Sequence, residues 1–528
     1  MPDFDAIIIG GGHNGLACAA CLARGGRRVL VLEARKLVGG FATTEAPFAN
    51  LPHIISPMAS MDLATANMPP SIIDDLRLAE HGLGLIEVDP FYSHVTQDGR
   101  SFAFWRSIDR TCAEIAQFSA RDARRYREMT AAFIALWRTM SPYLHAHPRR
   151  PGIGTIASVL TAAIRSQAGL RGAARALFSS PYAVIEENFE SPALRAALAI
   201  FAAASGSPLD EPGSGLIMAM MAMQHEWGVR RPKGGMGAFS DALRRAAEAH
   251  GAEIRTGCPV RGVIMQQDRA VGVETADGEA IFARNVIAAL DPITLFTKLV
   301  STGAVPEKLQ RELKALGVWR ANLAPMRVDL AVLGKPEMVV PAERAEVLLP
   351  TSTLLGPGFE ATQQFLKVAA AGHLPDGDIP IWPASPSRLD RSLVAGEAEL
   401  ETFYIFVPAV PYRLAGGARW SDLREVVAER VISTMGRVMP GIGGRIIGRS
   451  VRTPQDIEET SGIHRGSAYH ADLSLAQMGV WRPTPSLAGY ETPIAGLWHT
   501  AAGAHPVAGV NGLAGAIAAR TVLRRGFA

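Results

Sequence analysis

Short apolar runs separated by helix-like patterns open the chain. Residues 6–9 are an alanine and three isoleucines, which predicts a strand buried on both faces. Residues 15–24 are rich in alanine and leucine and predict a helix that ends near Gly25. Residues 28–32 predict a second strand, with Glu33 at its end. Together these segments predict a βαβ unit.

Three glycines occupy the turn between the first predicted strand and the helix. Gly10, Gly12 and Gly15 match the G-x-G-x-x-G pattern of dinucleotide-binding turns. The first glycine permits the tight turn, the second lets a pyrophosphate approach the backbone, and the third lets helix and strand pack closely. The helix N-terminus adds free N–H groups and the positive end of the helix dipole. Glu33 is placed to bind a ribose hydroxyl and would repel a 2′-phosphate, which disfavours NADP.

A second glycine pair distinguishes between the two common dinucleotides. Gly39 and Gly40 follow Glu33 closely, and an NAD domain does not need glycines there. They fit the longer FAD molecule, whose pyrophosphate and ribityl chain meet a further backbone segment. We therefore predict FAD as the cofactor, and assign Arg35, Gly39 and Gly40 to its binding. No dedicated second nucleotide site is expected, and no metal site, because the CxxC of Cys18 and Cys21 lacks a partner motif.

The sequence DAIIIGGGHNGLACAACLARGGRRVLVLEARKLVGG, residues 5–40, resembles FAD-dependent phytoene dehydrogenase-related oxidoreductases. That group includes carotenoid desaturases, carotenoid isomerases and the pyridine nucleotide-disulfide oxidoreductase domain-containing branch. The resemblance continues at residues 72–85, 232–291 and 466–519. It implies an α/β fold: a Rossmann-like FAD-binding domain with a mixed-sheet plus helical substrate domain.

The resemblance also implies cofactor contacts in the middle and last segments. Val260 is expected at the adenine through its backbone, and Gly503 at the pyrophosphate and ribityl region. Gly509, Val510 and Asn511 are expected beside the flavin ring, at the N-terminus of a final helix. Electron-rich flavin edges are stabilised by such helix N-termini, so residue chemistry and resemblance agree here.

The FAD-binding domain is expected to be discontinuous. Its three parts would be residues 1–95, 231–295 and 456–528. A helical region for substrate or membrane contact (96–230) and a substrate-domain sheet (296–455) would lie between them. Within them, 327–333 and 401–412 predict strands, and a β-meander is expected from 253 to 290. The methionine run Met218, Met220, Met221 and Met223 predicts either adaptable core packing or a deformable wall for an apolar ligand.

Histidines supply the candidates for proton chemistry. His505, in the C-terminal glycine-rich turn, is the first candidate, and His53, after the second glycine pair, is the other; His470 precedes the last predicted strand. Each of the three could equally make a structural hydrogen bond. Hydride loss that leaves a stabilised cation needs no strong base, so a missing base does not exclude dehydrogenation.

The predicted function is therefore FAD-dependent desaturation of an apolar, isoprenoid-like substrate by hydride transfer to flavin N5. A redox-neutral isomerase, a flavin amine oxidase and a non-catalytic prenyl carrier remain alternatives. Oxygen or a quinone is the expected electron acceptor. The oligomeric state is left open.

Charge and hydropathy limit the partners. The net charge of +3 gives no support for nucleic-acid binding. The N-terminus predicts no signal peptide, and no apolar run predicts a membrane span, so a cytoplasmic enzyme is expected. Arginines cluster at 121–127 and at Arg149 and Arg150. These clusters predict either solvated helix faces or peripheral contact with anionic lipid at the inner membrane.

Overall fold

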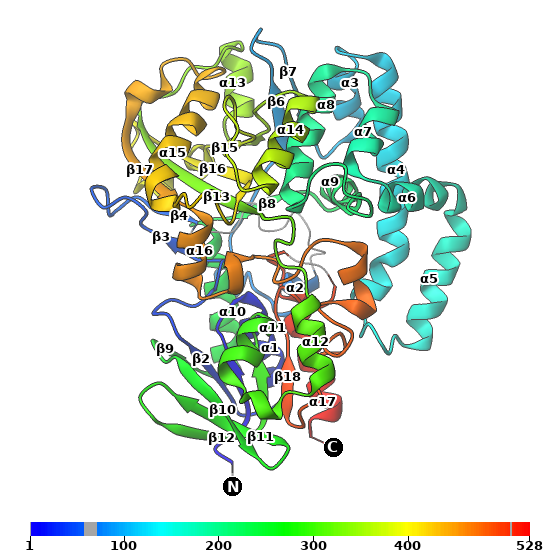
Figure 1. The fold of residues 1–528 in the computed structure, drawn as a ribbon, viewed down its shortest axis with the longest axis vertical. Coiled ribbons are helices and arrows are strands. Elements are labelled where there is room, and N and C mark those ends of the chain that lie inside the picture. Colours follow the sequence, from blue (N-terminus) through cyan, green and yellow to red (C-terminus); the bar gives the residue numbers. More distant parts are fainter. Residues whose placement is uncertain (1, 58–70, 507–508, 528) are drawn as a thin grey trace.

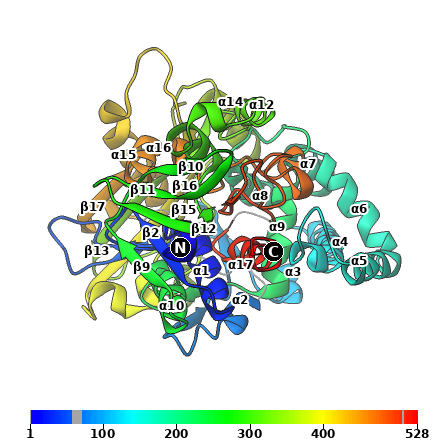
Figure 2. The same cartoon turned by 90° about the horizontal axis from the view of Figure 1, so that it is seen from below.

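The computed structural model describes residues 2–57, 71–506 and 509–527. The chain forms two parts, which lie one above the other in Figure 1. The lower part contains the first predicted strands and both chain ends. Figure 2 shows the molecule from below, with both chain ends towards the viewer and the C-terminus at α17.

The lower part is built on a mixed sheet with the strand order β10-β11-β12-β1-β2-β9, in which β18 also pairs with β12. Strands β9, β2, β1, β12 and β18 run parallel, and β10 and β11 extend the sheet antiparallel. The bounds are β1 Phe4–Ile9, β2 Val29–Glu33, β9 Glu253–Thr256, β10 Val260–Gln266, β11 Arg269–Thr275, β12 Ala280–Ala288 and β18 Leu497–His499. Strands from the beginning, middle and end of the sequence therefore share one sheet.

The strand β9 corrects one expectation. Residues 253–256 were expected to open the meander, but β9 pairs parallel with β2, from Leu30↔Glu253 to Glu33↔Thr256. Helix α10 (Met236–Ala249) precedes β9 and returns the chain to the starting edge of the sheet, so β9 enters in the same direction as β2. The antiparallel meander is confined to β10, β11 and β12.

Both faces of the parallel sheet are covered, as the unbroken apolar strands predict. Ala6 and Ile8 of β1 join the core formed with α1 (His13–Arg24), α10 and α17 (Leu513–Arg525). Ile7 and Ile9 join the opposite core, formed with the meander and α12 (Glu307–Ala315). A strand buried on both faces needs apolar residues at every position.

The upper part contains an antiparallel sheet with the order β15-β16-β13-β17. Both predicted strands are present here: β13 spans Leu323–Leu333, β16 spans Leu400–Pro411, and they pair antiparallel. The other strands are β15 Trp382–Ala384 and β17 Ile446–Arg452. Beside this sheet lie α13 Ala342–Leu348, α14 Phe359–Ala370, α15 Trp420–Gly436 and α16 Pro454–Ser461.

Helices dominate the segment from 108 to 227. They are α3 Ile108–Ile115, α4 Ala120–Leu144, α5 Ile153–Arg165, α6 Gln167–Phe178, α7 Pro181–Asn188, α8 Pro192–Ala202 and α9 Leu216–Trp227. The four methionines of the run lie on α9 and are buried. All four pack in the core of the upper part, and Met220 also lines the cavity described below.

Short elements complete the described chain. Strands β6 Tyr92–Val95, β7 Ser101–Phe104 and β14 Ser352–Thr353 form a small sheet, while β3 Thr44–Glu45 pairs with β4 Ser56–Pro57 and β5 Leu85–Glu87 with β8 Arg230–Pro232. The remaining described α-helices are α2 Ser71–Asp75 and α11 Pro292–Thr294.

Candidate active site

A cavity of about 380 Å³ lies where the two parts meet. One end is lined by the glycine turn after β1 and by Glu33 and Val260 of the lower sheet. The other end is lined by side chains from β6, α8, α9, β15 and β16 of the upper part. The cavity therefore brings a predicted dinucleotide-binding end and an apolar end into one continuous space.

The glycine turn has the geometry that its sequence predicts. A Cβ atom on Gly15 would lie 2.2 Å from the Gly10 carbonyl oxygen, so only glycine lets α1 begin this close to β1. Gly12, the N-cap of α1, borders the cavity, has no capping side chain, and a Cβ there would have no heavy atom within 4 Å. The N-terminus of α1 is thus bare main chain facing open space, as an anion-binding site requires.

Glu33 lies at the end of β2, and both of its carboxylate oxygens accept backbone hydrogen bonds. The N–H of Gly11 donates to Oε2 at 2.7 Å, and the N–H of Arg35 donates to Oε1 at 2.9 Å. Burial raises the pKa of Glu33, and these two N–H groups act in the opposite direction. The carboxylate is held at the cavity wall with lone pairs left for ribose hydroxyls.

The second glycine pair is attached directly to the first turn. The Gly39 N–H donates to the Gly11 carbonyl at 2.8 Å, and its φ of +120° is a conformation that glycine favours. Arg35 donates to the Gly40 carbonyl at 3.1 Å and forms an ion pair with Glu45. Arg35, Gly39 and Gly40 all line the cavity, which is where FAD binding would need them.

The last helix brings the residues before its N-terminus to the same cavity. Gly512 is the N-cap of α17 and has no capping side chain, although Asn511 Oδ1 accepts a bond from the Leu513 N–H at 2.9 Å. A Cβ on Gly515 would lie 1.9 Å from the Asn14 carbonyl oxygen, so α17 packs tightly on α1. The predicted cofactor residues that line the cavity are Gly10, Gly12, Glu33, Arg35, Gly39, Gly40, Val260, Gly509, Val510 and Asn511.

The two histidines predicted to be catalytic lie elsewhere. His53 Nε2 lies 2.6 Å from the Glu397 carboxylate, about two fifths of the His53 side chain is exposed, and His53 is not among the described residues of the cavity wall. His505 is buried, and its Nε2 lies 3.2 Å from the Tyr143 carbonyl oxygen. It too is outside the described cavity wall. Neither histidine is thus brought to the described cavity wall by this structure, and a catalytic role for either stays a prediction.

His470, the third candidate, does line the cavity. It is buried, and no described group pairs with its Nδ1. Its φ of +56° is unusual for a residue with a side chain and indicates that the surroundings hold it in place. Burial lowers the pKa of His470 to about 4, and the charge of Asp291 acts in the opposite direction. The imidazole is therefore neutral at pH 7, and burial makes it a weaker base than an exposed imidazole.

Gly503 makes the position of His470 possible. A Cβ on Gly503 would lie 2.9 Å from the His470 Cβ, closer than such atoms approach in proteins. Gly503 is not among the described residues of the cavity wall, so in this structure it acts behind His470.

We expect Gly503→Ala to displace His470 and to slow substrate-dependent flavin reduction about ten- to a hundredfold, with the bound flavin retained. Single-turnover kinetics with the flavin absorbance as the signal measures both quantities. Gly436→Ala, where a Cβ would meet no heavy atom within 4 Å, is the control. Loss of flavin from Gly503→Ala would instead support the direct cofactor contact that the resemblance implied.

His13 and Asp291 are titratable residues of this cavity wall that were not predicted. His13 occupies a variable position of the glycine motif, and burial lowers its pKa to about 4. Asp291 follows β12, and its carboxylate accepts bonds from the N–H groups of Thr294 and His464. Asp291 could have been found from the sequence, because ligands bind at the edge of the sheet where parallel strands end, and an acidic residue just after such a strand is a candidate ligand contact.

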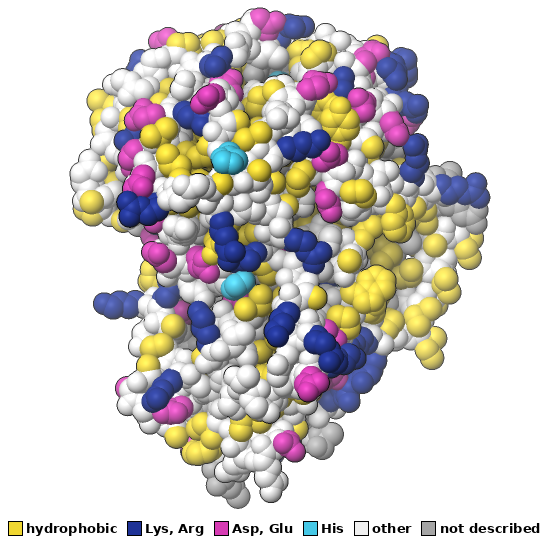
Figure 3. Space-filling view, in the orientation of Figure 1, with side chains coloured by type: hydrophobic (Ala, Val, Ile, Leu, Met, Phe, Trp, Pro, Cys, Tyr) yellow, Lys and Arg dark blue, Asp and Glu magenta, His cyan; other side chains and the backbone are white. Residues whose placement is uncertain are grey.

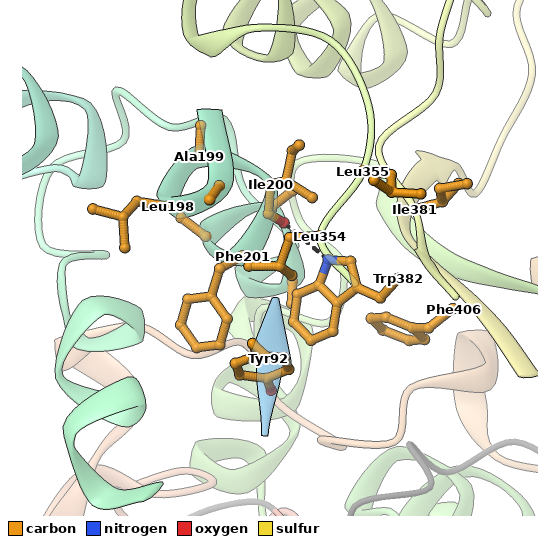
Figure 4. Close-up of a cluster of buried hydrophobic side chains, with 14 of the residues drawn as sticks. Tyr92, Leu198, Ala199, Ile200, Phe201, Leu354, Leu355, Ile381, Trp382 and Phe406 are labelled. Atoms are coloured by element: carbon orange, nitrogen blue, oxygen red, sulfur yellow. Dashed lines mark hydrogen bonds between the residues drawn. The ribbon is translucent and has the colours of Figure 1, made fainter. Parts of the chain in front are cut away.

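The far end of the cavity is aromatic. Trp382, Phe406 and Tyr92 line it, and Figure 4 shows them grouped with Phe201 around the ring of Trp382. The Trp382 ring stacks on Phe201 with a centroid distance of 5.5 Å, and its Nε1 donates to the Ile200 carbonyl at 3.2 Å. This fixed wall is suited to a large apolar ligand.

The sequence model of the "Flavin containing amine oxidoreductase" family matches residues 15–332, more than half of the chain. The chain belongs to this family. The match begins at the last glycine of the motif and extends into the upper sheet, so it includes β2 and β9 to β12 of the lower sheet but neither β1 nor β18. The chain is thus an FAD-dependent oxidoreductase, as the resemblance predicted.

Relatives of this flavin oxidoreductase align over almost its full length. "Pyridine nucleotide-disulfide oxidoreductase domain-containing protein 2" of Rattus norvegicus is 30% identical and covers 99% of this chain and 94% of its own. A limonene dehydrogenase subunit of Castellaniella defragrans is 27% identical, covering 98% and 94%. A lycopene-forming phytoene desaturase of Pseudescherichia vulneris is 24% identical, covering 96% of each chain.

Solved structures share the fold of this flavin oxidoreductase. An oxidoreductase from Methanosarcina mazei superposes with a TM-score of 0.61 at 15% identity, covering 98% of this chain and all of its own. Wild-type putrescine oxidase, solved with putrescine bound, gives a TM-score of 0.60 at 15% identity, covering 99% and 98%. The α/β architecture predicted from the sequence is confirmed.

The described residues fit FAD. The bare N-terminus of α1 with Gly12, the residues just before α17, and the buried carboxylate of Glu33 border one continuous space. When bound, FAD supplies an acceptor for a hydride at flavin N5.

Proposed function

We propose that this flavoenzyme desaturates a carbon–carbon bond of an apolar, isoprenoid-like substrate. The observation that carries the proposal is the continuity of the cavity: the dinucleotide end opens directly into the aromatic and aliphatic end. Apolar side chains of α8 and α9, including Phe201, Ile217 and Met220, add to that wall. Such a wall favours a hydrocarbon skeleton and excludes water from it.

The relatives support the same substrate class. A limonene dehydrogenase subunit and a phytoene desaturase both carry isoprenoid substrates in their names, and each aligns over 94% or more of its length. A desaturation removes a hydride and a proton from adjacent carbons. His470, neutral and unpaired at Nδ1 among the described groups, is the residue we propose to accept the proton.

One polar pair interrupts the apolar wall. Gln224 Nε2 donates to the Tyr92 hydroxyl at 3.2 Å, both side chains are buried, and no described group pairs with Gln224 Oε1. A buried amide oxygen without a partner is unfavourable unless a ligand supplies the donor. This pair therefore favours a substrate with a hydroxyl group on its apolar skeleton.

Amine oxidation is the second candidate, favoured by the aromatic wall, since aromatic faces attract cations. At the apolar end, however, the described wall residues include no carboxylate that could pair with an ammonium group. A redox-neutral isomerisation would use the same cavity and would need no external electron acceptor. In the desaturase, oxygen or a quinone would reoxidise the flavin.

Anaerobic mixing with paired substrates tests the proposal. We expect terpene alcohols to bleach the flavin at least about tenfold faster than hydrocarbons of the same skeleton, and amines to leave it oxidised. Gln224→Leu should remove the preference for the alcohol while keeping the hydrocarbon rate. Bleaching by amines alone would contradict the proposal, and conversion of a terpenoid without net flavin reduction would indicate the isomerase.

A further inference from the structure

Helices α5 and α6 form an arm at one edge of the molecule. Figures 1 and 2 both show the pair standing out from the body beside α4. Every residue of α5 is described, and none is buried. This is unlike α8 or α9, whose residues are mostly buried.

The exposed face of this arm is strongly apolar. Large apolar side chains are exposed at Ile153 (88%), Ile156, Leu160 and Ile164 of α5 and at Phe178 (72%), the last residue of α6. The four α5 positions are spaced by three, four and four residues, so they follow one helix face. Figure 3 shows the resulting apolar surface over α5 and α6, with basic side chains below it and at its upper edge. Soluble monomers seldom expose such a face unless it binds something.

The charges that the sequence places around the face have one sign. Residues 129–185 contain no aspartate or glutamate, but contain arginines at 138, 149, 150, 165, 171 and 175. Those at 138, 150 and 175 form ion pairs with carboxylates from outside this segment. Within the described part of the chain, the arginines at 165 and 171, at the junction of α5 and α6, have no such partner.

The first half of α4 differs from this segment. Three of its four arginines, at 121, 125 and 127, form ion pairs with carboxylates, which makes that part of the helix mostly a solvated face. An apolar helix face in a basic segment matches an anionic lipid surface, where aliphatic side chains enter the interface and arginines meet the phosphates. The arm, and not the α4 cluster, therefore has the chemistry of a lipid contact.

We propose that the α5–α6 face binds the surface of an anionic lipid membrane. Among the described helices, none has the length and hydrophobicity needed to cross a bilayer, so the contact would be peripheral. The face also adjoins the cavity wall. The Phe178 carbonyl accepts a bond from the Gly213 N–H at 3.1 Å, and the Ser179 carbonyl accepts one from the Gly215 N–H at 3.2 Å, just before α9 begins. Ile217 of α9 lines the cavity.

This adjacency suits an apolar substrate delivered from a membrane, a point that rests on the proposed function. The lipid contact itself does not, because vesicle binding and flavin bleaching are separate measurements. If vesicle binding fails, flavin bleaching still tests the proposed function, and if bleaching fails, vesicle binding still tests the lipid contact.

Flotation of the FAD-loaded full chain with vesicles tests the contact. We expect binding to phosphatidylcholine vesicles that contain phosphatidylglycerol, weaker binding at high salt, and little binding to phosphatidylcholine alone. Ile153→Ser combined with Ile164→Ser should reduce the bound fraction about tenfold or more, and Arg165→Gln combined with Arg171→Gln should reduce both binding and its salt dependence. Leu333→Ser combined with Val426→Ser, at residues 52% and 54% exposed outside α5 and α6, should bind like the wild type.

Three outcomes would overturn the proposal. The wild type could stay unbound with both vesicle types, or it could bind both equally. The serine variant of α5 could float like the wild type, which would place the contact elsewhere. The wild type could fail to float and sediment as a dimer, while the α5 serine variant sediments as a monomer. That result would make the face an interface between two copies.

Discussion

Gly12→Val is expected to yield folded protein that retains less than about one tenth of the wild-type flavin, and to be inactive for that reason. The backbone of Gly12 has φ −67° and ψ 166°, which valine adopts without strain, and a Cβ there meets no protein atom within 4 Å. The added side chain would enter the space beside the N-terminus of α1. The FAD pyrophosphate would need the same space, so the variant should lose cofactor binding while it keeps its fold.

A matched control exists in the same chain. Gly152 is also a helix N-cap, with φ −62° and ψ 157°, and a Cβ there likewise meets nothing within 4 Å. It is outside the described cavity wall, so Gly152→Val should keep its flavin. The flavin absorbance near about 450 nm per mole of protein, with circular dichroism to verify folding, gives the answer. Normal flavin content in Gly12→Val would mean that the cofactor does not approach this turn.

The cofactor end of the site could be predicted because its chemistry is local in sequence. The strand, the turn and the acid of the first βαβ unit follow one another within 33 residues, and each has a physical requirement that a residue type reveals. Gly39 and Arg35 lie in the same segment. Resemblance extended the prediction to Val260 and Asn511, which are remote in sequence but lie at the same cavity.

The reactive end could not be predicted in the same way. A histidine in a glycine-rich turn looks like a catalytic group, but His505 points its Nε2 at the Tyr143 carbonyl, a contact across 362 residues that no local pattern reveals. His470 reaches the cavity because Gly503 leaves room behind it. The lining pair Tyr92 and Gln224 likewise meets only through the packing of β6 against α9. These positions depend on tertiary contacts, which periodicity does not encode.

Acidification from pH 7 towards pH 4 is expected to unfold the protein cooperatively. Burial lowers the pKa of six histidines to about 4: His13, His94, His225, His470, His499 and His505. In the unfolded chain these groups titrate near about 6.5, so between about pH 6.5 and pH 4 the unfolded state binds more protons than the folded state. Their contribution to stability is therefore complete above about pH 6.5 and is lost as the pH falls towards 4. Each shift is on the order of 3 kcal/mol, so the loss of only a few of these contributions is large beside a typical unfolding free energy of about 5–15 kcal/mol.

The melting temperature as a function of pH measures this loss, and one histidine outside the cavity isolates its cause. His94 is buried, and its Nδ1 lies 2.8 Å from the Leu354 carbonyl oxygen, a contact that a glutamine amide can replace without a titrating proton. The slope of stability against pH reports how many more protons the unfolded state binds than the folded state. We expect His94→Gln to lower this number by about one between about pH 6 and pH 4.5, because the unfolded state of the variant no longer gains that proton. His250→Gln, at an exposed position, should keep the wild-type slope. Equal slopes in all three proteins would show that carboxylates, and not buried neutral histidines, govern the acid transition.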